Sequence, residues 1–219
     1  MSSQPPERAS AESSAAPGSD RALRADARRN RERVLRTAQR LFATEGLGVS
    51  LDEIARRAGV GPGTVHRHFP SKEALYLAVA TDEFEQLVTE AEALATTDDP
   101  EALFTQLSRM IATGAENVTV KSALEAAELD LRTAAPKVAA DLTRHVADLL
   151  DRAHTAGAVR PDVTVDDVMA LVAGAFSAIR HAKAETSRER TAHIAQIILD
   201  GLRPRHQPRS ATTTAKSQS

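Results

Sequence analysis

The stretch from Ser50 to Lys72, SLDEIARRAGVGPGTVHRHFPSK, constrains the fold of this chain more than any other segment. Ser50 is followed three residues later by Glu53, a spacing typical of a capping box, which predicts that a helix begins after Ser50. Gly59 stands where this helix must end, because glycine tolerates the positive φ that a tight turn often needs. Pro62 suits the first position of a second helix. The stretch therefore predicts a helix-turn-helix.

Both helices of this motif carry an apolar face. In the first helix the apolar residues recur at helical spacing, and they are Leu51, Ile54, Ala55 and Ala58. In the second helix, residues 62–69, we expect Val65 and Phe69 to be buried. The outward side chains of the second helix would remain available to a partner, as in a recognition helix that enters the major groove of DNA.

The string GVGPGTVHRHFPSKEAL resembles the signature of the TetR/AcrR family of bacterial transcriptional regulators. The elements of the signature occur in order: a helix cap, a turn, a Gly-Thr pair, a Phe-Pro pair that ends the second helix, and Ser-Lys-Glu at the start of the next helix. The resemblance is therefore specific from about Asp26 to Leu94. Beyond residue 95 it is only architectural, because family members share a helical ligand domain but little sequence there. The chain departs from the pattern at His66, where many members carry Tyr.

The resemblance implies a homodimeric regulator in the cytoplasm that binds a palindromic operator in double-stranded DNA. We expect a repressor that a small-molecule effector releases from its operator. Two alternatives stay open. One is a DNA-binding regulator with no effector, constitutive or activating. The other is a helical enzyme with an incidental helix-turn-helix.

Periodicity and composition predict an all-α fold, because the helical pattern is Ala-rich and alternation of β-branched residues is nearly absent. Residues 23–70 are expected to form a three-helix DNA-binding domain. Residues 71–202 are expected to form the effector-binding and dimerisation domain, with a connecting helix over 71–94. The flanking residues 1–22 and 203–219 lack periodicity and are predicted to be disordered.

The remaining helix boundaries follow from caps, prolines and glycines. The first helix of the DNA-binding domain is predicted over residues 26–45, with Gly46 just past its end. The helices of the second domain are predicted over residues 100–117, 121–132, 135–156, 164–184 and 187–202.

The charge of the chain is segregated, although its net value is only −2. Residues 21–81 hold 12 Lys and Arg against 6 Asp and Glu, whereas residues 82–202 hold 11 against 21. A basic domain on an acidic one is typical of a local nucleic-acid surface. Uneven but solvated surface charge is the alternative that the charge alone leaves open.

DNA contact is predicted for residues of the helix-turn-helix. Arg67 can pair with guanine O6 and N7, and Lys72 lies at a helix N-terminus that favours a phosphate. The full set is Ser50, Gly63, Thr64, His66, Arg67, His68 and Lys72. Ahead of the domain, an arginine cluster is either a phosphate-contacting or minor-groove arm or a solvated flank. The cluster is Arg21, Arg24, Arg28 and Arg29.

The last two predicted helices are apolar on more than one face, and Gly174 within the first of them suggests close approach by another helix. The resemblance implies that this pair forms a four-helix seam with its copy in a dimer. Filling the core of a single protomer is the alternative. The interface residues expected are Val168, Val172, Gly174, Ala175, Ile179, Ile194 and Ile198.

A small-molecule pocket is implied by the family and would lie among the helices of the second domain. Candidates combine bulk with occasional polar groups, although each also suits an ordinary core. They are Phe84, Phe104, Met110, Leu124, Glu128, Leu129, His145, Leu149 and Phe176.

Other classes of function have little support in the sequence. No Cys is present, which excludes disulfides and thiolate chemistry. No apolar run approaches the roughly 20 residues of a membrane span. No elbow motif or glycine-rich phosphate loop frames a catalytic site, and the histidines lack metal-ligand spacing. We therefore expect no enzyme activity, no metal, no cofactor and no membrane partner.

Overall fold

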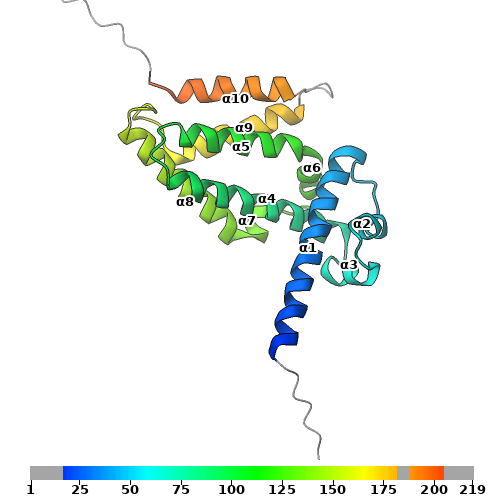
Figure 1. Cartoon of the computed structure of the whole chain (residues 1–219). Helices are drawn as coiled ribbons and strands as arrows, with labels where there is room; N and C mark the ends of the chain where they lie inside the picture. Colours follow the sequence, from blue (N-terminus) through cyan, green and yellow to red (C-terminus); the bar gives the residue numbers. More distant parts are fainter. Residues whose placement is uncertain (1–16, 182–187, 205–219) are drawn as a thin grey trace, which may run out of the picture.

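The computed structural model of the chain describes residues 17–181 and 188–204, and every regular element within these ranges is an α-helix (Figure 1). This confirms the predicted all-α fold, in which a helix-turn-helix unit precedes a helical domain. The helices are α1 (Pro17–Glu45), α2 (Leu51–Ala58), α3 (Pro62–His68), α4 (Lys72–Ala95), α5 (Ala102–Glu116), α6 (Val118–Ala126), α7 (Leu131–Ala134), α8 (Pro136–Thr155), α9 (Val165–His181) and α10 (Arg188–Leu202).

Helices α1 to α3 form a unit that we call the head, and its local signals act as the sequence predicts. Ser50 Oγ accepts the backbone N–H of Glu53 at 3.1 Å and begins α2. Gly59 ends α2 with a φ of 64°. Ser71 Oγ accepts the N–H of Ala74 at 3.1 Å and begins α4. Both caps and the turn between α2 and α3 are therefore confirmed.

The core of the head lies where α1 crosses α2, α3 and the first turns of α4. Phe42 of α1 and Tyr76 of α4 meet edge to face, with ring centroids 5.2 Å apart. The other buried side chains come from all four helices and include Val34, Leu35, Ala38, Leu41, Ile54, Ala55, Val65, Phe69, Leu75 and Val79. The apolar stripes predicted for the helix-turn-helix are thus buried.

Helix α1 begins at Pro17, nine residues before the predicted start. Residues 17–22, which the sequence predicted to be disordered, are helical, and residues 1–16 lie outside the described residues. Proline suits a first helical position, and Ala, Arg and Leu have high helix propensity. These local preferences outweigh the lack of an apolar stripe that motivated the disorder prediction.

Helices α5 to α10 follow the connecting helix α4 and form a unit that we call the body. Its core is built where α4 packs against α8 and α5, and α10 lies along α5 on the side away from α4 (Figure 1). Buried side chains there include Leu87, Leu103, Leu107, Met110, Leu142, Val146, Leu149 and Val168. Helix α9 approaches α5 so closely that a Cβ added at Gly114 would lie 2.1 Å from the Phe176 ring.

The predicted helix over residues 121–132 is wrong, because the chain forms two shorter helices, α6 and α7, in that region. Glu128, between them, has a φ of 56°, a left-handed conformation that ends the first helix. Helix α6 then packs against the head, where Val120 and Leu124 are buried in the same apolar cluster as α1 to α4. The head core therefore includes a wall supplied by the body.

Glu83 of α4 lies between the two apolar clusters. Its side chain is buried, and Gln39 of α1 donates a hydrogen bond to the carboxyl, while Oε1 has no hydrogen-bond partner among the described residues. Burial, with the Asp82 and Glu116 carboxylates nearby, raises the pKa of Glu83 to about 8. The boundary between head and body thus crosses α4 near an acid that is mostly protonated at neutral pH.

The end of the described chain is tied to the body. Arg203, placed by the sequence in a disordered tail, makes a two-pronged ion pair with Glu101 at 2.9 and 2.6 Å. Residues 182–187 and 205–219 lie outside the described residues, so the predicted ends of the last two helices at 184 and 187 and the rest of the tail are not described. No helix within the described ranges is long and apolar enough to cross a membrane.

Candidate nucleic-acid interface and effector groove

Helix α3 presents a polar face because its apolar residues turn inward. Gly61 is its N-cap in extended conformation, Pro62 is at its first turn, and Val65 and Phe69 are buried against the head core. The predicted contact residues Gly63, His66, Arg67 and His68 are exposed, and Thr64 is half-buried. One short helix thus brings five of the seven predicted DNA contacts onto one accessible element.

Arg67 lies along its own helix in this structure. Its Nε donates to the carbonyl of Gly63 at 3.0 Å, and a terminal nitrogen lies 3.4 Å from Thr64 Oγ1. Both bonds are exposed and each replaces a bond to water, so little free energy holds the guanidinium there. Arg67 can therefore turn outward and offer its paired donors to a guanine edge.

His66 is held by a neighbour that sequence reasoning did not identify. Its Nε2 lies 2.9 Å from Oδ1 of Asp52 in α2, and both side chains are largely exposed. The contact joins the two helices of the motif and orients the imidazole. The signal for it was present, because Asp52 stands in the first turn of α2, yet only the folded turn brings the two residues together.

Lys72 and Ser50 have structural roles besides any contact with DNA. Lys72 Nζ donates to the carbonyls of Leu47 at 3.2 Å and Gly48 at 3.4 Å, and the hydroxyl of Tyr76 donates to the same Leu47 carbonyl at 3.3 Å. An ammonium has three donors, so one remains for a phosphate. Ser50 is exposed, but its Oγ already accepts the backbone N–H of Glu53 that caps α2.

The surface of α2 away from its apolar face carries an ion-pair network. Glu53 binds Arg56 and Arg57, and Arg57 also pairs with Glu45 at the end of α1. The hydrogen bonds from Arg56 and Arg57 lower the pKa of Glu53 to about 2, so the network persists across the physiological range. The Glu53 carboxylate thus binds the two arginines. In a full capping box it would instead accept the backbone N–H of Ser50.

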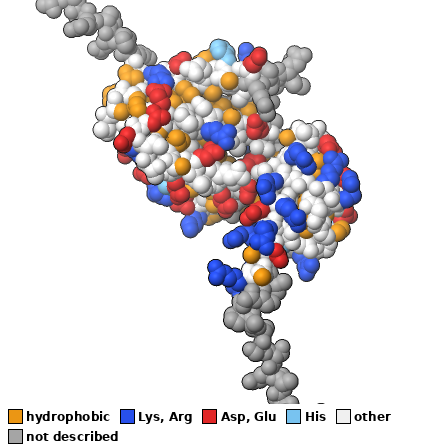
Figure 2. Space-filling model, viewed as in Figure 1, with side chains coloured by type: hydrophobic (Ala, Val, Ile, Leu, Met, Phe, Trp, Pro, Cys, Tyr) orange, Lys and Arg blue, Asp and Glu red, His pale blue; other side chains and the backbone are white. Residues whose placement is uncertain are grey.

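Lys and Arg side chains gather over the head and along the projecting start of α1, whereas Asp and Glu side chains are denser over the body (Figure 2). This agrees with the segregation seen in the sequence. A duplex seated on α3 would therefore meet a mainly basic surface.

Arg67→Ala is expected to cost about 1–3 kcal/mol of operator binding and to relax the preference for one base pair in each half-site. The reason is loss of a paired donor to a base edge, with the head fold unaffected because the side chain is exposed. Binding to a panel of operator variants measures the preference. An unchanged preference at every position would contradict the readout role.

The nine predicted effector residues do not surround one cavity. Leu124 and Leu129 pack with the head core, and Glu128 is exposed in the turn after α6. His145 is buried but faces Glu92 of α4, with Nε2 and Oε1 3.2 Å apart. The others fill or flank the body core, and they are Phe84, Phe104, Met110, Leu149 and Phe176.

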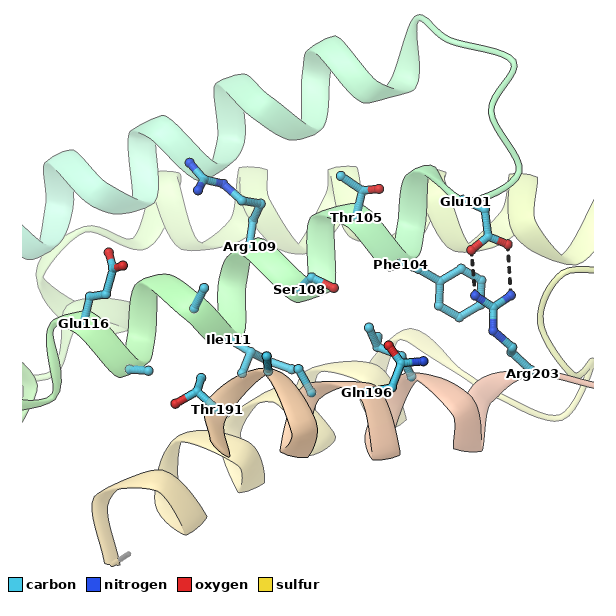
Figure 3. A pocket seen from close by; sticks show the side chains of 15 residues that line it. Glu101, Phe104, Thr105, Ser108, Arg109, Ile111, Glu116, Thr191, Gln196 and Arg203 are labelled. Atoms are coloured by element: carbon cyan, nitrogen blue, oxygen red, sulfur yellow. Dashed lines mark hydrogen bonds and ion pairs between the residues drawn. The ribbon is translucent and has the colours of Figure 1, made fainter. Parts of the chain in front are cut away.

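The body does hold a groove of about 820 Å³ between α5 and α10 (Figure 3). Of the predicted residues only Phe104 lines it, beside apolar residues of both helices such as Ile111, Ala112, Ala195 and Leu199. Sequence reasoning missed the groove because its apolar residues equally suit helix packing and its polar residues equally suit a solvated helix surface.

One end of the groove is closed by an aromatic and ionic cluster. The Arg203 guanidinium carbon lies 4.1 Å from the centroid of the Phe104 ring, and its nitrogens bind Glu101 (Figure 3). The hydrogen bonds from Arg203 lower the pKa of Glu101, so this carboxylate stays ionised. Glu116 and Thr191 stand toward the other end. The groove therefore combines apolar residues of both helices with polar side chains along its length and an ion pair at one end.

Another buried polar group was also missed. Gln106 of α5 is fully buried, and its Nε2 donates to the Leu87 carbonyl of α4 at 3.1 Å, while its Oε1 has no partner among the described residues. A buried orphan amide oxygen costs stability. No three His, Asp or Glu side chains converge on a metal-binding geometry in the described part of the chain.

Four of the predicted interface residues of α9 are turned toward their own protomer. Val168, Val172, Ala175 and Ile179 are buried in the body, so their assignment to a seam between copies is corrected. Ile194 and Ile198 of α10 are half-buried against a small cluster around Ile111. Gly174 is exposed and has no atom within 4 Å of an added Cβ, so no contact within the protomer requires glycine there.

The outer surface of α9 and α10 nevertheless carries large apolar side chains among polar ones. Leu171 is 40 % exposed and Ile197 is 59 % exposed, and among the residues whose side chains the structure describes they are the large hydrophobic ones that are exposed. Helical spacing places Gly174 one turn from Leu171. An exposed face with apolar side chains is therefore present on these helices, and of the residues named from the sequence Gly174 lies near Leu171 on it.

Comparison with known proteins agrees with this geometry. Residues 34–79 match the family model for bacterial regulatory proteins of the tetR family, and residues 98–204 match that for the SbtR-like transcriptional regulator C-terminal domain. Curated relatives are HTH-type transcriptional regulators of Staphylococcus aureus. One, from strain bovine RF122 / ET3-1, is 30 % identical over 50 % of this chain and 61 % of its own length. Another, from strain USA300, is 37 % identical over 31 % and 37 %.

Solved structures extend the similarity over nearly the whole fold. The TetR transcription regulatory protein from Mycobacterium vanbaalenii is 44 % identical, with a TM-score of 0.66, over 83 % of this chain and 99 % of that one. The TetR transcriptional regulator SCO0520 from Streptomyces coelicolor is 31 % identical, with a TM-score of 0.63, over 80 % and 98 %. With its helix-turn-helix and its helical second domain, the chain belongs to the TetR family of DNA-binding transcriptional regulators.

Proposed function

We propose that this regulator is a homodimeric repressor that a small molecule releases from a palindromic operator in the cytoplasm, and that it catalyses no reaction. The observation that carries the proposal is the groove between α5 and α10, which gives the body a place for a ligand. Its volume of about 820 Å³ falls within the range of about 300–1,000 Å³ that is usual for small-molecule sites.

Dimerisation is supported by the outer face of α9 and α10. A protein that reads a palindrome places two recognition helices about one helical turn of DNA apart, which requires two copies. Leu171 and Ile197 give this face exposed apolar area, and Gly174 would let a second copy approach closely. Contact between two copies would remove both side chains from water, which favours association.

The groove indicates the chemical class of the effector. Alanines and other apolar residues of α5 and α10 line it beside polar side chains such as Ser108 and Gln196, and the Glu101–Arg203 ion pair stands at one end. An elongated molecule with an apolar body and a polar end would match both features. Arg203 and Phe104 would meet an anionic or planar end group, with Glu101 displaced from its ion pair.

The groove is also connected to the head through the helices α5 and α6. Helix α5 forms one wall of the groove and leads through Asn117 into α6, whose Val120 and Leu124 are buried in the head core. A ligand that shifts α5 would therefore move α6 together with the head, because α6 is packed into the head core. The shift weakens operator binding only to the extent that the ligand prefers the shifted state, typically by about 1–3 kcal/mol.

Phe104→Ala is expected to weaken the effector response and to leave effector-free operator affinity nearly unchanged, because Phe104 lines the groove far from α3. The operator is first obtained by selecting bound fragments of the source genome, and compounds related to the neighbouring genes are then titrated against the protein–operator complex. Induction curves for wild type and variant measure the response.

Phe84→Ala is the matched control, since Phe84 packs on the same body core but does not line the groove. It should lower stability without a selective loss of induction. If no ligand displaces the wild-type protein from its operator, or if Phe104→Ala and Phe84→Ala impair induction equally, the groove is not the effector site.

A further inference from the structure

One polar contact of the helix-turn-helix joins its two helices at an exposed position. His66 of α3 and Asp52 of α2 lie with Nε2 and Oδ1 2.9 Å apart, on helices that pack side by side in the head (Figure 1). Their side chains are 49 % and 71 % exposed. An ion pair this exposed contributes little to stability, so the head does not need it in order to fold. The pair is therefore open to a partner that approaches α3.

Asp52 decides which nitrogen of the His66 ring carries a proton. A carboxylate has acceptors and no donor, so Nε2 is the donor in the 2.9 Å contact. A neutral imidazole has a single N–H, which leaves Nδ1 as an acceptor. No described residue bonds to Nδ1. Neutral His66 therefore has its one donor bound to Asp52 and offers only an acceptor to a further partner.

The other ionisable side chains around α3 contact different groups. Taken from α1, α2, α3 and the start of α4, they are Arg31 over the Phe69 ring, Arg56 on Glu53, Arg67 on the Gly63 carbonyl, His68 beside Phe69, and Lys72 on the Leu47 carbonyl. Within the described ranges, Asp52 is the charged group that lies within ion-pair distance of His66. The imidazole thus faces one negative charge and no positive charge at that range.

A DNA phosphate would be a second anion beside this imidazole. Half to two-thirds of the hydrogen bonds between proteins and DNA go to phosphate and sugar, so a phosphate is the commonest partner for an exposed side chain of this kind. Neutral His66 cannot donate to both Asp52 and a phosphate, because it has one N–H. An imidazolium donates at both nitrogens, and a nearby opposite charge favours the charged form. An approaching phosphate therefore favours protonation of His66.

We infer that Asp52 and His66 form a proton-linked DNA contact, in which the imidazole of each protomer takes up a proton and bridges Asp52 and a phosphate of the operator. The proton goes to Nδ1, which then donates to the phosphate while Nε2 still donates to Asp52. Asp52 is a positioning residue, because it acts on DNA through the ring that it holds. The inference rests on DNA binding through α3 and adds to it a dependence of affinity on pH.

The sign of this dependence follows from the proton count. The complex holds more protons than the free protein and free DNA, so its formation is favoured at low pH and weakened as the pH rises. Histidine is the side chain whose charge ordinarily changes between about pH 5 and 8, which places the effect in the physiological range. A base amine would instead donate to the Nδ1 acceptor of neutral His66, and binding would then take up no proton.

The test measures operator affinity between about pH 6 and 8.5 at constant salt for wild type and for His66→Gln. Wild type should take up about half a proton or more per bound protomer, so its affinity should fall roughly threefold or more per pH unit for each protomer. Gln keeps N–H donors but does not titrate, so the variant should lose most of this dependence. Comparison of the two proteins removes contributions from other titrating groups, such as Glu83.

Calorimetry counts the protons directly. The apparent heat of operator binding depends on the heat of ionisation of the buffer in proportion to the protons taken up, so two buffers at one pH suffice. Wild type should show uptake, and His66→Gln should show less than half of it. A wild-type protein that binds operator with no uptake would overturn the inference and leave the role of α3 intact. A wild-type protein that binds no duplex would overturn both.

Asp52→Asn separates positioning from a merely structural role. Asn keeps the size of the side chain and an acceptor for Nε2–H but lacks the charge, so proton uptake should fall to less than half of the wild-type value. A structural role would instead lower affinity by the same factor at every pH. Uptake equal to that of wild type in Asp52→Asn would therefore overturn the role of Asp52.

His68→Gln is the matched control, because it makes the same chemical change at an exposed neighbour on α3 that has no ion pair in the described part of the chain. It should retain more than half of the wild-type proton uptake, whatever its effect on affinity. His66→Tyr introduces a phenol, which ordinarily titrates near pH 10 and can donate to a phosphate at neutral pH. It should bind operator at pH 8 at least as well as wild type, with little uptake. A larger loss of uptake in His68→Gln than in His66→Gln would overturn the inference.

Discussion

Ile197→Lys is expected to leave the protomer folded and to reduce operator affinity by about 10²- to 10⁴-fold. The side chain is 59 % exposed in the protomer, so little packing is lost there. In a seam between copies, the lysine would become a buried charge without a partner. In a dimer, binding of one half-site holds the second recognition helix at a high effective concentration near the other half-site. A monomer lacks this advantage, so its operator affinity is lower.

Sedimentation of the variant at micromolar concentration measures its oligomeric state, and titration with operator measures its affinity. Gly174→Leu is a second variant for the same surface, since nothing within the protomer lies near an added Cβ. Ala140→Lys introduces the same charge at an exposed position of α8 and serves as the control. A dimer that survives both Ile197→Lys and Gly174→Leu would place the interface elsewhere.

Glu83→Gln should remove a pH dependence of stability worth a few kcal/mol. The folded state raises the pKa of Glu83 from 4.5 to about 8, so it holds a proton that the unfolded chain releases. Stability falls with rising pH wherever the folded state binds more protons. The loss begins above about pH 4.5, grows by about 1.4 kcal/mol per pH unit, and is complete above about pH 8.

Denaturant unfolding at several values between pH 5 and 8.5 measures the effect. In wild type the contribution of Glu83 to the free energy of unfolding should decline across this range, and in Glu83→Gln it should be absent. The amide keeps the volume and the hydrogen bond to Gln39. Glu85→Gln, at an exposed position two residues along α4, is the control and should leave the pH dependence as in wild type.

The head was predictable from sequence because its signals are local. The Ser50 cap, the Gly59 turn and the Pro62 start each act within a few residues, and the folded structure confirms them. The orientation of side chains on the head surface was not predictable. Lys72 and His66 find partners 25 and 14 residues away, and only the closed fold brings these together.

The body was predictable in helix content but not in the facing of its helices. Helix α9 carries apolar residues around more than one face, so spacing alone did not decide whether Val168 and Val172 or Leu171 turned inward. The left-handed turn at Glu128 had no glycine or asparagine to mark it. The groove depends on how α10 rests on α5, a long-range packing that no short sequence pattern encodes.

The packing of α6 against the head core determines where the molecule can bend. Stripping Val120 and Leu124 from the head core would cost about 1.5–3 kcal/mol for each side chain. That sum exceeds the coupling of about 1–3 kcal/mol that is typical of allosteric ligands. Helix α6 and the first turns of α4, which Lys72 and Tyr76 tie to Leu47, must therefore travel with α1 to α3 as one rigid unit. The hinges then fall at Asn117 and in α4 near Glu83, well inside the ligand-binding half of the chain.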